Sequence, residues 1–381
     1  MPWETKSVEK QREDFLNEVK CHGNISKACR NNGITRKTGY KWLTRETEGE
    51  KLSDQSRRPK RVANRTDLET EKLILSVRDI NKSWGGRKIH DYLVNQGKDH
   101  LPSARTCCNI LSRYNRIHPD ESVKHNPYQR FEREYPNELW QTDFKGDFLL
   151  LDGKRCYPLT ILDDHSRFSI MIDCKLNTKG VRDSFERAFY IYGLPDSVLS
   201  DHGCQFAGFK EGYTFFERWL MEHDILPIHG RVGHPQTQGK IERFHRTYKY
   251  EFLQHNSFEN IEDIREKTEC FRIKYNEVRP HLALNSKCPA DIYTPSKRVY
   301  SEIISEYIYD GHIRKVNNWG ILRFDKYQIY LSETMANTVL EIGEGTTTDT
   351  FNVYFRNFKI AEIDAQEGKL KNRKISRRRE K

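Results

Sequence analysis

The sequence predicts a multidomain protein with two all-α N-terminal units, an α/β core built on a mixed five-stranded sheet, and a small C-terminal β-barrel. Three observations support this. The chain has 381 residues, more than one hydrophobic core usually supports. Its apolar periodicity is helical as far as residue 117 and strand-like from residue 135. Its net charge is +9 over residues 1–134 (28 basic, 19 acidic), −6 over 135–368 and +7 over 369–381.

This charge distribution indicates a polyanionic partner, since cationic ends gain free energy by releasing counterions from DNA or RNA. An acidic middle fits such a partner if it holds metal ions that reverse the local sign. Basic runs that only keep the chain soluble are the alternative. Nine scattered cysteines predict neither a disulfide framework nor a zinc site. Without a long apolar segment or a signal peptide, the chain is expected to be soluble and cytoplasmic, with no membrane partner.

Residues 1–48 are predicted to be a helix-turn-helix domain. Residues 8–21 have helical apolar spacing, and residues 24–45 read as a helix, a tight turn at Asn32-Gly33 and a second helix capped by Thr35. The residues expected to face the core are Ile34, Tyr40 and Leu43. The residues left for the major groove of DNA are Arg36, Lys37, Thr38, Lys41 and Arg45. A helical hairpin with a charged face is the alternative.

A basic linker and a second helical domain follow. Residues 49–66 lack apolar periodicity and contain Pro59, which is typical of a linker. Residues 67–118 return to a helical pattern of three helices with a basic third one, and are predicted to be a second helix-turn-helix domain. The phosphate contacts expected there are Arg105, Arg113 and Arg116, although surface solvation explains these cations equally well.

The α/β core is predicted over residues 135–293. Three runs rich in β-branched and aromatic residues are separated by the turns DGKR (152–155) and DDHSR (163–167), which predicts antiparallel strands. Helical and strand segments then alternate, and the last helix begins near Thr237. The order β-β-β-α-β-α-β-α gives a mixed sheet covered by helices.

Three acids in this core are candidate metal ligands. Asp143 lies in the first predicted strand, Asp201 at the carboxyl end of the fourth, and Glu242 in the last helix. If the fourth strand lies beside the first, the two aspartates become neighbours at the centre of the sheet. Close ionised carboxylates need compensation, which Mg²⁺ supplies through oxygen coordination. The sequence therefore predicts the outline of a phosphoryl-transfer site.

The last predicted helix presents Glu242 among cations. On a helical wheel, Glu242, Arg246 and Lys249 fall within about 60° of one another. The apolar residues that gather on another side are Ile241, Phe244, Tyr248 and Phe252. Glu242 would hold metal while the two cations hold DNA phosphates. An exposed Glu242–Arg246 pair, worth about 0.3–0.5 kcal/mol, is the alternative without a catalytic role.

Further DNA contacts are expected around this helix. Lys240 and Arg243 lie on it, and His234 and Gln238 lie in the loop before it. The two loop residues would position the DNA end. A role in packing the loop explains them as well.

Four sequence blocks resemble a known family. They are LWQTDFKG (139–146), SDHGCQF (200–206), GHPQTQGKIERFHRTYKYEF (233–252) and YNEVRPHLALNSKCPADIY (275–293). Residues 135–293 resemble prokaryotic insertion-sequence transposases of the retroviral-integrase type, and the two upstream helical units agree with that family in order. The resemblance implies a ribonuclease-H-like catalytic core in which Asp143, Asp201 and Glu242 take the positions of the D-D-E metal ligands. It also implies two Mg²⁺ ions per active site, for which Mn²⁺ substitutes.

The function implied by the resemblance is DNA transposition. Such a protein, associated with the nucleoid, binds double-stranded DNA at the terminal repeats of its element and at the target, and forms a homo-oligomer when assembled on DNA. It hydrolyses a phosphodiester and transfers the strand. In two departures, His202 replaces the usual Asn, and the 40 residues between Asp201 and Glu242 exceed the family's common spacing. A catalytically silent, domesticated transposase acting as a DNA-binding regulator and an unspecific nuclease are the alternatives.

The C-terminal region is predicted to be a small barrel followed by a basic tail. Alternating segments between residues 310 and 365 predict about five strands, similar to the C-terminal barrels of related transposases, which would bind DNA or a second subunit. Residues 369–381 are predicted to be disordered in isolation and to contact DNA electrostatically.

Overall fold

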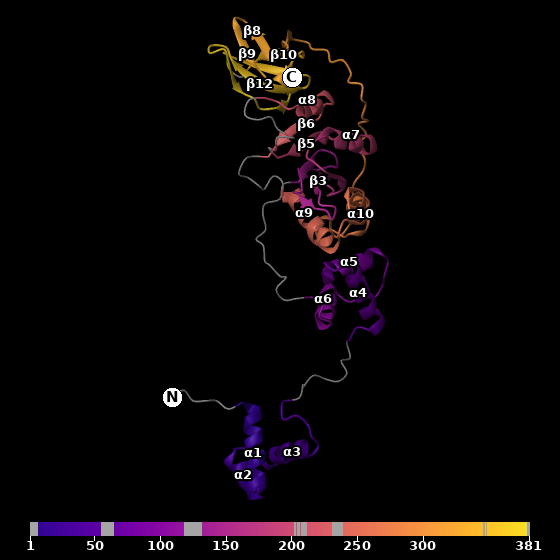
Figure 1. Cartoon of the computed structure of the whole chain (residues 1–381), viewed down its shortest axis with the longest axis vertical. Helices are drawn as coiled ribbons and strands as arrows, with labels where there is room; N and C mark the ends of the chain where they lie inside the picture. Colours follow the sequence, from indigo (N-terminus) through magenta and orange to yellow (C-terminus); the bar gives the residue numbers. More distant parts are fainter. Residues whose placement is uncertain are drawn as a thin grey trace. The chain divides into compact units, whose positions relative to one another are not determined.

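The computed structural model of the chain divides into two compact units, residues 1–65 and 66–381, and each is described by itself (Figure 1). The described residues are 7–54, 65–117, 132–201, 203, 206, 212–230, 239–345, 347 and 349–378. The predicted loop contacts His234 and Gln238, the family departure at His202 and most of the predicted linker lie outside these ranges.

The first unit is a cluster of three helices. They are α1 (Val8–His22), α2 (Ile25–Asn31) and α3 (Arg36–Thr47). The Thr35 hydroxyl accepts a hydrogen bond from the Thr38 N–H, and Gly33 has a φ of +61°, so the predicted cap and turn are both present. The core consists of Phe15, Leu16, Ala28, Cys29 and Trp42.

One core residue of this unit differs from the prediction. The Tyr40 side chain, predicted to face inward, is 49 % exposed. The inward positions of α3 are Gly39 and Trp42, because a Cβ at residue 39 would lie 2.5 Å from the Cys29 sulfur and glycine alone lets the two helices approach so closely. The bulk of Trp42 fills the remaining space, and Tyr40 is left in solvent.

The second unit begins with the three helices predicted after the linker. They are α4 (Leu68–Ile80), α5 (Gly86–Asn95) and α6 (Ala104–Arg113). The carboxylate of Asp67 caps α4 and the hydroxyl of Ser103 caps α6. The apolar residues that bury against one another include Ile74, Trp84, Ile89, Ile110 and Leu111.

The α/β core follows in the same unit. Its strands are β1 (Trp140–Phe144), β2 (Phe148–Leu149), β3 (Arg155–Asp163), β4 (Ser169–Lys175), β5 (Ser197–Ser200) and β6 (Leu226–His229). The five longer strands lie in the order β4-β3-β1-β5-β6, and the two-residue β2 adds a sixth strand beside β3. The β1–β3 and β3–β4 pairs are antiparallel, whereas β1–β5 and β5–β6 are parallel. The predicted mixed sheet is therefore present, with β1 at its centre.

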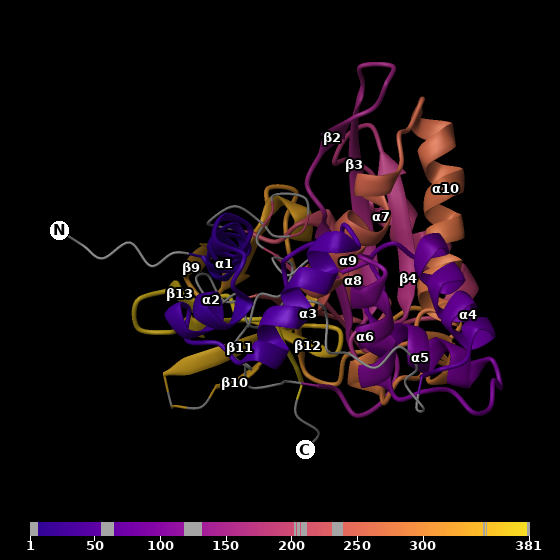
Figure 2. The same cartoon turned by 90° about the horizontal axis from the view of Figure 1, so that it is seen from below.

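Helices pack against this sheet through two separate apolar clusters. The helices are α7 (Val181–Tyr192), α8 (Phe215–Glu222), α9 (Gly239–Glu251) and α10 (Ile261–Ile273). One cluster joins the sheet to α7 and α8, and the other joins it to α9 and α10. Figure 2 shows α10 running beside β4. Side chains alternate along β1, so Trp140 packs on Phe189 of α7 whereas Gln141 and Asp143 contact α9.

The α4–α6 helices dock on the carboxyl end of α9. The indole N–H of Trp84 donates to one carboxylate oxygen of Glu251 at 3.1 Å, and the Lys88 ammonium donates to the other at 3.0 Å. The guanidinium of Arg279 binds both oxygens, at 2.9 and 2.8 Å. A second contact joins Asp91 to the Ser286 hydroxyl at 2.5 Å. Glu251, with a side chain 13 % exposed, therefore connects the helical part to the core.

The C-terminal region is an open sheet, which corrects the predicted barrel. Its strands are β7 (His312–Lys315), β10 (Val339–Glu344), β11 (Thr350–Phe355), β12 (Phe358–Asp364), β13 (Lys369–Asn372) and β14 (Ser376–Arg377), with the separate hairpin of β8 (Ile321–Phe324) and β9 (Tyr327–Tyr330). Among the described residues, β13 and β7 are edges that do not pair with each other. Leu322 and Ile329 of the hairpin, with Tyr213 just before α8 and Met221 within it, cover the apolar face that closure would otherwise bury.

The basic tail, predicted to be disordered in isolation, is ordered as far as Arg378 by its contacts with the rest of the chain. Both β13 and β14 pair with β12, and Leu370 and Ile375 pack against the apolar cluster of the sheet. Arg377 pairs with Asp224 at 3.1 Å, and Arg378 binds both carboxylate oxygens of Glu341. Two apolar side chains and fixed carboxylate partners thus order a segment that charge alone would leave in solvent.

Candidate active site

The three acids of the predicted triad come from β1, from the residue after β5 and from the first turn of α9. In the parallel β1–β5 pair, Gln141 lies opposite Leu199. When this register is continued by two residues along both strands, Asp143 lies beside Asp201. The two aspartates are therefore neighbours, as expected for adjacent strands. His245 of α9 approaches the same aspartate, with its Nδ1 3.8 Å from the Asp143 Oδ2.

Electrostatics link the three carboxylates. Burial, followed by repulsion from Asp201 and Glu242, raises the pKa of Asp143 to about 7, and the Phe144 N–H and the Lys145 ammonium act in the opposite direction. Within the described ranges, no three or more His, Cys, Asp or Glu side chains are placed closely enough to hold a metal ion. The donor set still fits a hard divalent cation, because all three donors are carboxylates and a cation would relieve their repulsion.

Two residues that the sequence analysis did not select support Asp143. The Thr160 hydroxyl donates to the Asp143 carbonyl at 2.8 Å and lies 2.7 Å from the His245 Nε2. Burial, with a smaller contribution from Lys145, lowers the pKa of His245 to about 3, so its ring is neutral at neutral pH. The position of His245, three residues after Glu242 on a helix, is the signal that could have identified it.

A third such residue, Lys145, brings a cation to the site. Burial and then the neighbouring charge of Lys249 lower the pKa of Lys145, whereas Asp143 raises it. The two ammonium groups therefore lie close enough to repel each other beside the acids. Lys145 follows Asp143 by two residues, a spacing that directs both side chains to one face of a strand.

The face of α9 that carries Glu242 is exposed, as the helical wheel predicts. Glu242, Arg243, Arg246 and Lys249 are in solvent, and Ile241, Phe244 and Tyr248 are buried. Lys240 differs: its side chain is only 14 % exposed and its ammonium lies 2.5 Å from the buried Asp164 carboxylate. We therefore correct the predicted DNA contact at Lys240, because this cation is already paired inside the core.

The other predicted DNA contacts fall into two groups. Arg36, Lys37, Lys41 and Arg105 are exposed, and Thr38 is partly buried at the start of α3. Arg45, Arg113 and Arg116 pair with carboxylates of their own helical clusters, namely Glu50, Glu71 and Asp79. Arg45 also stacks on Trp42, 4.9 Å from the ring centroid. These three cations hold the local fold in the structure.

Two protein-family matches fall on this core. The family described as "Integrase core domain" matches residues 133–235, and a second family of the same description matches residues 223–289. Together the two matches cover residues 133–289. All three candidate acids and the elements β1, β5 and α9 lie inside this matched segment.

Relatives with similar sequences come from mobile elements. A protein of insertion element IS407 from Burkholderia multivorans is 29 % identical over 158 residues, 41 % of this chain and 55 % of the relative. A protein of insertion element IS476 from Xanthomonas euvesicatoria is 24 % identical over 57 % of this chain and 62 % of the relative. The transposase of transposon Tn552 from Staphylococcus aureus is 24 % identical over 69 % of this chain and 62 % of its own length. The chain thus spans between half and two thirds of these relatives.

Solved structures give weaker likenesses. The HTLV-2 integrase catalytic core domain in complex with magnesium is 17 % identical, with a TM-score of 0.30 over 42 % of this chain and 97 % of the other. A simian T-cell lymphotropic virus intasome chain is 15 % identical, with a TM-score of 0.37 over 64 % of this chain and 83 % of the other.

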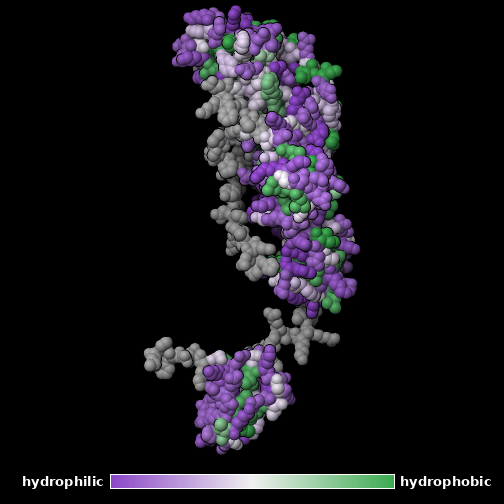
Figure 3. Space-filling view, viewed as in Figure 1, coloured by the Kyte–Doolittle hydropathy of each residue, from purple (hydrophilic) through white to green (hydrophobic). Residues whose placement is uncertain are grey.

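The surface drawn in Figure 3 is mostly hydrophilic, with small scattered apolar patches. None of the helices in the described ranges combines the length and apolar character that crossing a membrane requires.

Proposed function

We propose that this protein is a DNA transposase that cuts the ends of its own element and joins them to target DNA. The observation that carries the proposal is the position of Asp143 on β1, Asp201 directly after the neighbouring β5 and Glu242 in the first turn of α9, inside the segment that matches the integrase core families. Relatives from insertion elements and a transposon support it.

The acids would hold the metal on which the chemistry depends. Asp143, Asp201 and Glu242 are the proposed ligands, and two Mg²⁺ ions, or Mn²⁺ in their place, would supply activation of the nucleophile and stabilisation of the leaving oxygen. In the first step, water attacks the phosphodiester at the element end and a 3′-OH leaves. In the second, that 3′-OH attacks a phosphodiester of the target and displaces the 3′-OH of the target strand, so no covalent protein intermediate is needed.

Residues around the acids would position the DNA. Arg246 and Lys249 extend from the exposed face of α9, and Lys145 adds a third cation beside them, so phosphates near the acids meet positive charge from both a strand end and a helix. The His245 ring contacts the Thr160 hydroxyl, which in turn donates to the Asp143 carbonyl. Because this ring is neutral, the phosphate contacts fall to the three cations.

Recognition of the element would fall to the helical parts. We assign the terminal repeats to α1–α3, with Arg36, Lys37, Thr38 and Lys41 facing the major groove, and a second reading or positioning contact to α4–α6 through Arg105. We expect the protein to act as a homo-oligomer on double-stranded DNA in the prokaryotic cytoplasm, in association with the nucleoid.

Cleavage of labelled element ends in Mg²⁺ tests this proposal. Asp143→Asn, Asp201→Asn and Glu242→Gln should each abolish cleavage and strand transfer and leave end binding intact, because an amide keeps the shape but loses the ligand charge. Asp152→Asn, which changes an acid in the β2–β3 turn, is the matched control and should cleave normally. Near-normal cleavage by any triad variant would remove that residue from the site. End binding without cleavage by the unaltered protein would favour the silent DNA-binding regulator.

A further inference from the structure

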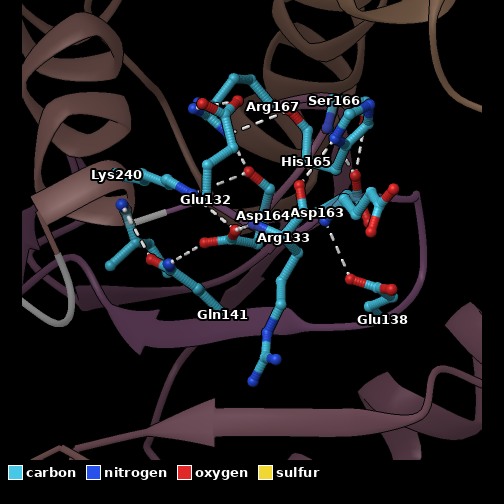
Figure 4. A network of polar contacts seen from close by, with 12 residues as sticks. Glu132, Arg133, Glu138, Gln141, Asp163, Asp164, His165, Ser166, Arg167 and Lys240 are labelled. Carbon is cyan, nitrogen blue, oxygen red and sulfur yellow. Dashed lines mark hydrogen bonds and ion pairs between the residues drawn. The ribbon is translucent and has the colours of Figure 1, made fainter. Parts of the chain in front are cut away.

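A buried polar network fastens the first turn of α9 to the sheet (Figure 4). Asp164, in the turn between β3 and β4, has a fully buried side chain. Its Oδ1 accepts a hydrogen bond from the Gln141 Nε2 at 2.7 Å, and its Oδ2 accepts one from the Lys240 Nζ at 2.5 Å. The Gln141 Oε1 accepts a hydrogen bond from the Ile241 backbone N–H at 3.3 Å. Strand β1, the turn and α9 therefore meet at one carboxylate.

The turn that carries Asp164 is itself held rigidly. The neighbouring Asp163 is also fully buried and accepts hydrogen bonds from the Ser166 N–H and hydroxyl and from the Asn137 N–H. The Arg167 guanidinium donates to the carbonyls of Asp164 and His165 and pairs with Glu132 at 2.9 Å. Figure 4 shows these side chains gathered around the turn. The DDHSR segment is thus more than the hairpin turn that the sequence predicts.

Stability alone does not account for such a network. Taking Asp164 and Lys240 out of water costs free energy that their attraction repays only with good geometry, and apolar replacements of similar volume often stabilise a protein equally well. The network does satisfy one of the N–H groups that the first turn of a helix leaves without an intrahelical partner. Its distinctive result is geometric, since it fixes the start of α9 relative to β1.

That geometry matters for the acids. Asp143 and Asp201 are placed by the pairing of β1 with β5, whereas Glu242 comes from an element outside the sheet. Glu242 directly follows the residue whose N–H is held, and Asp143 lies two residues after Gln141 on the same face of β1. We propose that Lys240, Asp164 and Gln141 are positioning residues that hold Glu242 within reach of the two aspartates. This inference rests on the proposed function of the acids as metal ligands.

Three measurements on the full chain distinguish this role from DNA contact by Lys240. Lys240→Met should weaken Mg²⁺ binding, measured by titration calorimetry without DNA, by about tenfold or more. It should raise the Mg²⁺ concentration for half-maximal cleavage by a similar factor, with activity recovering as Mg²⁺ is increased. The slope of log K against log[salt] for DNA binding should stay unchanged. A phosphate contact would instead lower that slope by about 0.9 and leave Mg²⁺ binding unaltered.

Partner variants make the test specific. Gln141→Leu keeps the Lys240 and Asp164 charges and removes the hydrogen bonds of Gln141 to the Ile241 N–H and to Asp164. It should therefore weaken Mg²⁺ binding in the same direction, and it decides the matter if Lys240→Met does not fold. Asp164→Asn combined with Lys240→Met should lose no more affinity than the worse single variant, because both changes break one contact. Lys267→Met removes the ion pair with Asp263 on α10 and is the control, with no expected change in Mg²⁺ binding.

The inference is overturned if folded Lys240→Met and Gln141→Leu proteins bind Mg²⁺ as the unaltered chain does. A uniform loss of cleavage at every Mg²⁺ concentration, with normal Mg²⁺ binding, would overturn it too. Failure of the proposed function would look different. The unaltered chain would then bind Mg²⁺ in the calorimeter but cleave no element ends, and the positioning role would still be measured by the titration.

Discussion

Glu251 provides the most quantitative prediction from this structure. Its carboxylate is bound by two nitrogens of the Arg279 guanidinium and by Lys88 and Trp84. Burial disfavours the charged carboxylate, but the contact with Arg279 favours it more strongly than any other contact does. The pKa of Glu251 therefore falls from 4.5 to about 2. At about 1.4 kcal/mol for each tenfold change in proton affinity, the charged form gains about 3 kcal/mol on folding. Glu251→Gln, which resembles the protonated acid, should therefore destabilise residues 66–381 by about that amount at pH 7.

The pH dependence gives this prediction its sign. Because the folded pKa lies below the unfolded one, the stabilisation is complete above pH 4.5 and is lost as the pH falls toward 2. Urea unfolding of the full chain, followed by tryptophan fluorescence at several pH values, measures it. The gap in unfolding free energy between the unaltered protein and Glu251→Gln should be widest near pH 7 and should shrink steadily below pH 4.5.

Lys88→Met is the matched control, since Lys88 touches the same carboxylate. Burial and repulsion from Arg279 lower the pKa of Lys88 to about 8 despite its contact with Glu251, so its own charge opposes folding at neutral pH. The lowered pKa of Glu251 means that folding favours its charged form, whereas the lowered pKa of Lys88 means that folding disfavours its charged form. The cation that stabilises the Glu251 carboxylate is therefore Arg279, through its bidentate pair. We expect Lys88→Met not to destabilise the protein. Equal losses of unfolding free energy in Lys88→Met and Glu251→Gln would refute this reasoning. So would a difference in unfolding free energy between the unaltered protein and Glu251→Gln that does not change with pH.

Two further predictions concern DNA. Replacing Arg246 and Lys249 together by Ala should weaken binding to all sequences alike and lower the slope of log K against log[salt] by about 1.8, and parallel titration lines of equal affinity would exclude a DNA contact by this face of α9. Deleting residues 1–65, a compact unit by itself, should leave a folded protein that binds DNA without preferring its own ends, and a retained preference in a gel-shift assay would assign recognition to residues 66–381.

Local patterns in the sequence predict much of this fold because they act over short distances. The helices, the cap at Thr35, the turn at Gly33 and the β-β-β-α-β-α-β-α order all follow from side-chain periodicity and turn chemistry. The active-site prediction requires β5 to lie beside β1, and in the structure the two strands pair in parallel. The assignment of Asp143, Asp201 and Glu242 as ligands stays a prediction.

Other features depend on contacts that periodicity does not encode. Lys240 is indistinguishable from Arg243 as a basic residue on a helix until the β3–β4 turn brings Asp164 to it. The C-terminal strands alternate as barrel strands would, but β13 and β7 do not pair in the described part of the chain, and the hairpin, Tyr213 and Met221 share the apolar cluster of the sheet. Tyr40 and Trp42 both suit a core, and the close approach of Cys29 to Gly39 decides which face of α3 is buried. In each case a residue distant in sequence determines the outcome.

Helix α9 is anchored at both ends. Gln141 binds the Ile241 N–H near its start, and Trp84 and Lys88 bind the Glu251 carboxylate at its end, so the length of the helix fixes the distance between these two contacts. Glu242 and Glu251 are nine residues apart, so the helix spaces the acids from the α4–α6 dock by about 13 Å. Lengthening α9 by one turn would add about 5.4 Å, more than the 3.4 Å or so between successive nucleotides of a strand. If α4–α6 contacts the element end as proposed, the length of one helix sets which phosphodiester lies at the acids, and a one-turn insertion would move the cut by one or two nucleotides.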